Sequence, residues 1–225
     1  WLKYHRNQPS LGAINNWNHG LTLAKGDHIM VLHHDESMVS DDFLTRVSAA
    51  FLPQVDVVVS NVSVDGGRQK WWLHHVLSPL LLHFPTTLFA CNFIGPTACL
   101  CFKKEQMQLF NPSLCWAVDY EWYYRMLQNS RVRYLRTNYI RSHHGHKGQI
   151  SQTIDIQMVR QSDNETLRKM YASHLRIRLF IFIGKVIRKF LLALHSKRTH
   201  CYCTLSIKLN LLFYRIIQTL KYFRR

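Results

Sequence analysis

The sequence lacks several patterns that would assign a chain to a common class at once. Its six cysteines form no C-x-x-C pair, so they do not have the spacing of a zinc site, and we interpret them as reduced, buried apolar residues of a cytoplasmic protein. No apolar run approaches the ~18 residues that a membrane-spanning helix needs. Residues 1–10 contain neither the apolar core of a signal peptide nor an initiating Met, so we expect the sequence to begin inside a longer protein.

Acidic residues are absent from the last part of the chain. Residues 166–225 carry 14 Lys and Arg and no Asp or Glu, whereas residues 1–165 carry 15 basic and 13 acidic residues. Most of the net charge of +16 therefore belongs to the C-terminal segment. This distribution predicts a nearly neutral domain over residues 1–155 and a basic helical segment over residues 156–225 with a separate role.

The most informative stretch is residues 26–42. An apolar run at residues 29–32 predicts a short buried strand, which ends in the polar run HHDE at residues 33–36. The following residues predict a helix that begins near residues 40–42 and continues to Phe51. In α/β sheets, ligands bind at the carboxyl ends of strands. Imidazole and carboxylate groups there favour the binding of a divalent cation, and a bound cation in turn favours the binding of a phosphate. The alternative is a polar loop without a ligand.

The rest of the first domain alternates between strand and helix patterns, which predicts an α/β fold. Residues 69–93 are rich in aromatic residues and His, and they are either an insertion that wraps the site or a pair of core helices. The other expected elements are strands over residues 1–9, 55–64, 131–135 and 138–142, a strand after Gly95-Pro96, and helices over residues 13–24, 103–109 and 117–127.

The basic segment predicts helices over residues 151–171, 175–194 and 205–223. Lys and Arg recur on one stripe of the second helix, at Arg178 and Lys185, with apolar residues around the rest. Such a basic amphipathic helix is typical of an element that lies on an anionic membrane surface. Helices that simply pack on the domain are the alternative.

Three separated motifs occur in order along the chain. The first motif, N-x₄-G-x₃-A-x-G-D-x-I-x₂-L-x₂-D-[DE], starts at Asn15 and ends at Glu36. The second, D-x-x-W-x-x-R, starts at Asp119, and the third, H-x-G-Q-x-S, starts at His146. In this order they resemble the motifs of the family 2 glycosyltransferases, and the resemblance covers about residues 1–155. The segment NFIGPTACLCFKKE, from Asn92, is similar to the acceptor-side strand of the family.

This resemblance implies a partial GT-A fold, an α/β sheet with flanking helices, followed by the C-terminal basic amphipathic helices. It also implies an inverting enzyme that moves a sugar from a nucleoside-diphosphate sugar to a hydroxyl of a saccharide or lipid-linked acceptor. Assembly of cell-surface polysaccharide or lipopolysaccharide at the cytoplasmic face of the membrane is the expected setting. The similarity begins at the third strand of the family, so the strands that hold the nucleoside are expected to be missing.

The family's residue roles carry over by motif position. Asp119 matches the general base, with a plain helix N-terminal acid as the alternative. Asp35 matches the Asp that binds the divalent metal, Mg²⁺ or Mn²⁺, and His33 takes the place of the first Asp of that motif. The residues implied for the donor diphosphate are His33, Asp35, Glu36 and His146, and those implied for the acceptor side are Asn92, Gly95 and Trp122.

Other functions remain open from the sequence. An inactive, truncated remnant would share the fold and differ only in turnover. A polyanion-binding protein built on the basic segment is another alternative. Nucleic acid is not an expected partner. A nucleic-acid groove would need its Lys and Arg on the folded domain, but that domain is nearly neutral and the basic excess lies in the C-terminal segment.

Overall fold

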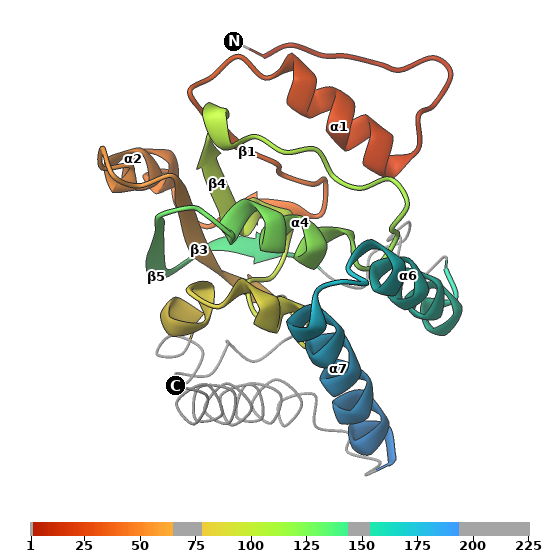
Figure 1. Cartoon of the computed structure of the whole chain (residues 1–225). Helices are drawn as coiled ribbons and strands as arrows, with labels where there is room; N and C mark the ends of the chain where they lie inside the picture. Colours follow the sequence, from red (N-terminus) through yellow and green to blue (C-terminus); the bar gives the residue numbers. More distant parts are fainter. Residues whose placement is uncertain (1, 65–77, 144–153, 194–225) are drawn as a thin grey trace.

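A five-stranded mixed sheet organises the residues that the computed structural model describes, which are 2–64, 78–143 and 154–193 (Figure 1). Strands β3 and β5 run parallel, and the other neighbouring strands pair antiparallel. In order across the sheet, the strands are β1 His28–Met30, β4 Leu100–Lys103, β3 Val57–Val64, β5 Val132–Ser142 and β2 Glu36–Met38.

Strand β3 lies at the centre of the sheet because its sequence tolerates burial on both faces. Val57, Val58 and Val59 expose at most 1 per cent of their surface, although successive side chains point to opposite faces. A continuous β-branched run is typical of a strand that is covered on both sides. The strand predicted over residues 55–64 is therefore confirmed.

Helices flank this sheet. The helices predicted over residues 13–24 and 117–127 are confirmed, and so is the one predicted from about residues 40–42 to Phe51, which forms over Phe43–Ala50. Helix α4 fills much of the core, because Trp122 and Tyr123 have no exposed surface. The helices are α1 Ala13–Leu23, α2 Phe43–Ala50, α4 Val118–Leu127, α6 Ile156–Met170 and α7 Leu175–Ala193, with 3-10 turns η1 Pro85–Phe89, η2 Thr97–Cys99 and η3 Lys104–Gln106.

The prediction of an edge strand over residues 1–9 is wrong for the part that the structure describes. The edges of the sheet are β1 and β2, and residues 2–10 pair with neither. Leu2 and Tyr4 are 87 and 83 per cent exposed, so this segment has no buried face that would hold it against the sheet.

Two other strand predictions differ from the structure in their bounds. The first strand stops at Met30 because the chain then turns and starts β2 at Glu36. Leu32, which was predicted to be buried in this strand, is 43 per cent exposed. The HHDE run therefore connects two strands of the sheet. The strands predicted over residues 131–135 and 138–142 form the single strand β5, whose pairing with β3 shifts register around Asn61.

The first part of the basic segment packs against the domain. On α7, Ile177, Phe180 and Ile181 are buried, and Gly184 approaches the backbone of Ala90, just after η1, so closely that a Cβ would lie 2.9 Å from its carbonyl oxygen. No helix among the described residues is both long and apolar enough to cross a membrane. The helix predicted over residues 205–223 lies outside the described residues.

Candidate active site

The turn between β1 and β2 places the imidazole of His33 in a fixed orientation. The indole of Trp17, on α1, stacks on this ring with centroids 4.4 Å apart and planes at 23°. The hydroxyl of Thr97 lies 3.2 Å from His33 Nε2, and the Glu36 carboxylate lies 3.6 Å from Nδ1. The ring is therefore held on one face and at both nitrogens.

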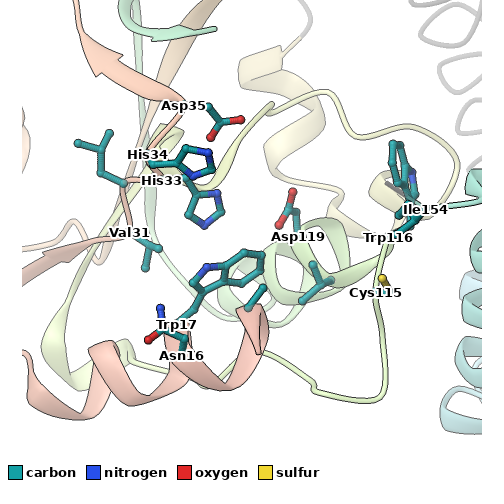
Figure 2. A pocket seen from close by; sticks show the side chains of 13 residues that line it. Asn16, Trp17, Val31, His33, His34, Asp35, Cys115, Trp116, Asp119 and Ile154 are labelled. Carbon is teal, nitrogen blue, oxygen red and sulfur yellow. The ribbon is translucent and has the colours of Figure 1, made fainter. Parts of the chain in front are cut away.

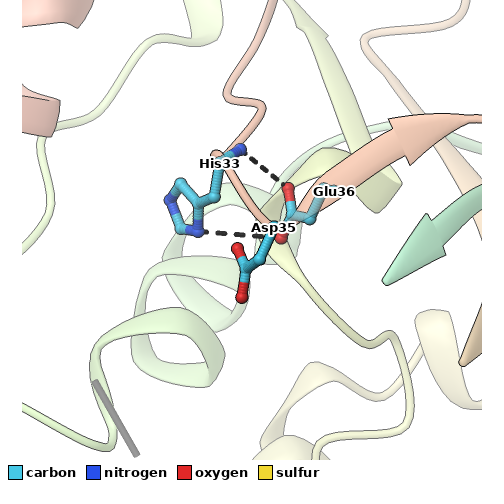
Figure 3. Close-up of side chains that lie close together, drawn as sticks. All are labelled: His33, Asp35 and Glu36. Carbon is cyan, nitrogen blue, oxygen red and sulfur yellow. Dashed lines mark hydrogen bonds and ion pairs between the residues drawn. The ribbon is translucent and has the colours of Figure 1, made fainter. Parts of the chain in front are cut away.

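His33, Asp35 and Glu36 form a cluster that can hold a metal ion (Figure 3). Each residue offers one ligand atom, and these atoms lie within 4.8 Å of one another. The Glu36 carboxylate also accepts a hydrogen bond of 2.9 Å from the backbone N–H of His33, which tightens the turn. One imidazole and two carboxylates suit a hard or borderline divalent cation, so the donor set fits Mg²⁺ or Mn²⁺.

Burial perturbs the titration of this cluster. Desolvation raises the pKa of the Glu36 carboxyl to about 7, opposed by the hydrogen bond from His33 and reinforced by the charges of Asp35 and Asp119. Desolvation also lowers the pKa of His33, although Asp35 acts in the opposite direction. A neutral imidazole beside crowded carboxyl groups is suited to a cation, because the cation's charge would offset their repulsion.

Asp119 faces this cluster from the other side of the same pocket (Figure 2). It lies in the first turn of α4. Burial raises the pKa of its carboxyl to about 7. A carboxylate with such a pKa is a stronger base than an exposed Asp, and it still ionises near neutral pH.

The pocket has a volume of about 570 Å³ and is lined by segments far apart in the sequence. Helix α1 contributes one wall, the β1–β2 turn a second, and the chain entering α4 a third. Pockets that mix apolar walls with a few converging polar groups are typical ligand sites. The lining residues include Ala13, Asn16, Trp17, Val31, His33, His34, Asp35, Cys115, Trp116, Asp119 and Ile154.

The residues predicted for the acceptor side do not line this pocket. Asn92 organises a turn: its side-chain oxygen accepts hydrogen bonds from the N–H groups of Ile94 and Gly95. Gly95 has φ 117°, which disfavours any residue with a Cβ. Trp122 has no exposed surface, and its indole N–H donates a hydrogen bond to the carbonyl of Gln108. In this structure the indole therefore packs in the core and is not accessible to a sugar-acceptor molecule.

Other predicted residues have different outcomes. Glu36 belongs to the cluster but is not one of the residues that line the pocket, and its side chain is buried at 8 per cent exposure. His146, with the third motif, lies outside the described residues. The sequence analysis did not single out Trp17 or Trp116, although both line the pocket. The available signals were a Trp in the helix pattern before the HHDE run and a Trp three positions before Asp119.

Comparison with known proteins establishes the class. The family model described as "Glycosyl transferase family 2" matches residues 2–126, which is more than half of the chain. The chain therefore belongs to glycosyl transferase family 2, and the family expected from the motifs is confirmed. The match includes the first two motifs, whereas the third lies beyond it. A search of curated proteins finds no match.

Two solved structures are similar to this chain, and the likeness to the first supports the same fold. One is S. aureus TarS, residues 1–349, in complex with UDP-GlcNAc, with a TM-score of 0.53 and 13 per cent identity over 75 per cent of this chain and 50 per cent of that chain. Another structure of S. aureus TarS 1–349 has a TM-score of 0.45 and 13 per cent identity over 72 and 52 per cent. This chain spans about half the length of the TarS chains, and the likeness to the first confirms the partial GT-A fold.

Proposed function

We propose that this chain is an inverting glycosyltransferase that moves a sugar from a nucleoside-diphosphate sugar to a hydroxyl acceptor. The observation that carries the proposal is the placement of Asp119 opposite His33 and Asp35 in one pocket. A base on one side and a cation-binding cluster on the other are the two parts that such a transfer needs. The S. aureus TarS structure, which holds UDP-GlcNAc, supports a nucleotide-sugar donor.

Asp119 is the group that takes the proton in this proposal. The acceptor hydroxyl oxygen attacks the anomeric carbon, the bond from that carbon to the diphosphate oxygen breaks, and the hydroxyl proton moves to the Asp119 carboxylate. The site needs only one catalytic carboxylate, in contrast to a glycoside hydrolase, which uses a pair.

The donor diphosphate belongs at the cluster opposite the base. His33, Asp35 and Glu36 would hold a divalent metal, and a metal bound there would supply positive charge against the charge that develops on the leaving nucleoside diphosphate. Thr97 and Trp17 hold the His33 ring in place for this role. His34 extends the wall beside them.

We also infer a setting at the cytoplasmic face of a membrane, with a saccharide or lipid-linked acceptor and a role in cell-surface polysaccharide or lipopolysaccharide assembly. The surface of α7 supports this inference. Leu175 and Phe182 are 76 and 57 per cent exposed, and Arg178 lies between them on the helix and is also exposed. Apolar and basic residues exposed on one helix suit an anionic lipid surface.

Donor binding tests the proposed function. We expect calorimetry on the full chain, with UDP-GlcNAc first and then other nucleoside-diphosphate sugars, to detect one donor that binds in the presence of Mn²⁺ and not in its absence. Asp35→Asn should weaken this binding at least about tenfold, because it removes the negative charge of a metal ligand. The matched control is Asp41→Asn, an exposed carboxylate close by that is outside the cluster, which should bind normally.

A folded chain that binds none of these donors would contradict the proposal and favour an inactive remnant. Equal binding with and without Mn²⁺ would retain a donor site and reject the metal.

A further inference from the structure

The helix that carries Asp119 begins without a cap from its own neighbourhood. Ala117 occupies the N-cap position of α4 and offers no side chain that could accept a hydrogen bond. The first backbone N–H groups of a helix have no partners within the helix, so an end without a cap frays. The residues just before α4, Cys115 and Trp116, also form a wall of the pocket.

Helix α6 instead holds the residues that lead into α4, through Asp163, a side chain that is only 3 per cent exposed. Its carboxylate accepts hydrogen bonds from three consecutive backbone N–H groups. The distances are 2.6 Å from Ala117, 2.7 Å from Trp116, and 3.1 and 3.2 Å from Cys115 to the two carboxylate oxygens. Hydrogen bonds to an ionised acceptor are stronger than those between neutral groups, so this contact holds the backbone firmly.

A second residue of α6 holds the side chain of the same wall. The guanidinium of Arg160 lies 4.6 Å from the centroid of the Trp116 ring. Helix α6 therefore contacts both the backbone and the aromatic ring of residues 115–117. The family match ends at residue 126, so it does not include this helix.

We propose that Asp163 is a positioning residue that fixes residues 115–117 and thereby holds the Asp119 carboxylate in line with the acceptor hydroxyl. The proposal rests on the proposed function, because it gives Asp163 a purpose through Asp119. Transfer needs the base within hydrogen-bond reach of the acceptor, and a displacement of about 1 Å can cost ~10²-fold in rate. Only Val118 separates Ala117 from Asp119, so backbone motion at residues 115–117 moves the base directly.

The test compares two substitutions of carboxylates that α6 carries. Asp163→Ala removes the acceptor for the N–H groups of residues 115–117, and Asp163→Asn keeps one oxygen that can accept a hydrogen bond. The control is Asp155→Ala, which removes the cap of α6 itself, where Asp155 accepts from the N–H groups of Gln157 and Met158. The full chain is assayed for kcat and donor KM, and for amide hydrogen exchange at residues 115–119.

We expect Asp163→Ala to lower kcat by about 10- to 100-fold and to leave donor KM within about twofold, because the donor cluster is on the opposite wall. Asp163→Asn should lose less. Amide exchange at residues 115–119 should become at least about tenfold faster in Asp163→Ala. Asp155→Ala should change both readouts by about threefold or less.

Equal losses in Asp163→Ala and Asp155→Ala would overturn the proposal, because general stability of α6 would then explain them. Faster exchange with an unchanged kcat would also overturn it. If the wild-type chain transfers no sugar, the proposed function fails, and exchange alone then decides whether Asp163 holds the backbone of Asp119. Faster exchange in Asp163→Ala than in Asp155→Ala supports this, and equal exchange rejects it.

Discussion

At the scale of single residues, the candidate base opposes folding while it serves the reaction. Burial raises the pKa of Asp119 from 3.8 to about 7, so the folded protein favours its protonated form. The ionised form, which accepts a proton, is the one that the folded state accommodates less well. Functional sites often retain such costs because the chemistry needs them.

Asp119→Asn should separate these two effects. We expect sugar transfer to fall at least about 100-fold, because a general base contributes about 10² to 10⁴ in rate. The free energy of unfolding at pH 8 should rise, because the variant no longer buries a charge. Urea unfolding of both proteins measures the difference, and a variant that transfers sugar at the wild-type rate would reject Asp119 as the base.

The pH dependence has a definite sign. A carboxyl with a raised pKa in the folded state stabilises the fold below its unfolded pKa, and this contribution is lost as pH rises through the folded value. For Asp119, stability should therefore fall between about pH 4 and 7, by at most ~4 kcal/mol. Asp119→Asn should flatten this slope without abolishing it, since the pKa of Glu36 is also raised to about 7. Transfer by the wild type should rise over the range in which Asp119 ionises.

At the scale of elements, α7 is joined to the domain by a close backbone approach. A Cβ at Gly184 would lie 2.9 Å from the Ala90 carbonyl oxygen and 3.0 Å from the Ala90 Cα, which are backbone atoms that cannot move aside like a flexible side chain. A glycine inside a helix usually lowers stability by roughly 0.5–1 kcal/mol. Here it permits the packing of Phe180 and Ile181 on the domain.

Gly184→Ala should therefore destabilise the protein by about 1–3 kcal/mol, since the added methyl group overpacks the contact. The matched control is Gly20→Ala on α1, where a Cβ meets nothing within 4 Å. That substitution should gain about 0.5–1 kcal/mol from helix propensity. Urea unfolding measures both, and an equal gain at the two positions would contradict the close packing of α7.

At the scale of the whole molecule, the distribution of charge distinguishes residues 1–165 from the segment that follows them. Residues 166–225 carry 14 basic residues and no acidic ones. Each Lys or Arg near an anionic membrane contributes about 1 kcal/mol of attraction, which salt screens. Helix α7, which packs on the domain and also exposes Phe182, is the described element that would connect the two roles.

We expect the full chain to float with vesicles of phosphatidylcholine and phosphatidylglycerol and to stay in solution with phosphatidylcholine alone. Raising the salt concentration should release it. Phe182→Ser should reduce flotation more than Leu44→Ser, an equally exposed apolar residue on α2, at 57 and 59 per cent respectively. Equal flotation with neutral and anionic vesicles would reject the electrostatic attraction.

Elements with a strong local pattern could be predicted from the sequence. The valine run of β3, the helix around Asp119 and the HHDE segment are each specified by neighbouring residues, because periodicity and turn chemistry are local properties. The ordered motifs also indicated the family. The edge strand over residues 1–9 failed because a strand exists only with a hydrogen-bonded neighbour, and the sequence does not state which neighbour is available.

The sequence by itself determined the chemistry that this protein can perform: the type and order of its candidate base and ligand side chains. Only the tertiary structure decided which of them meet. Thr97 reaches His33 from 64 positions away, and Asp163 holds the backbone of Ala117, just before α4, from 46 positions away. Such contacts leave no periodicity in the chain, because they form only when the packing of the core brings distant backbones together.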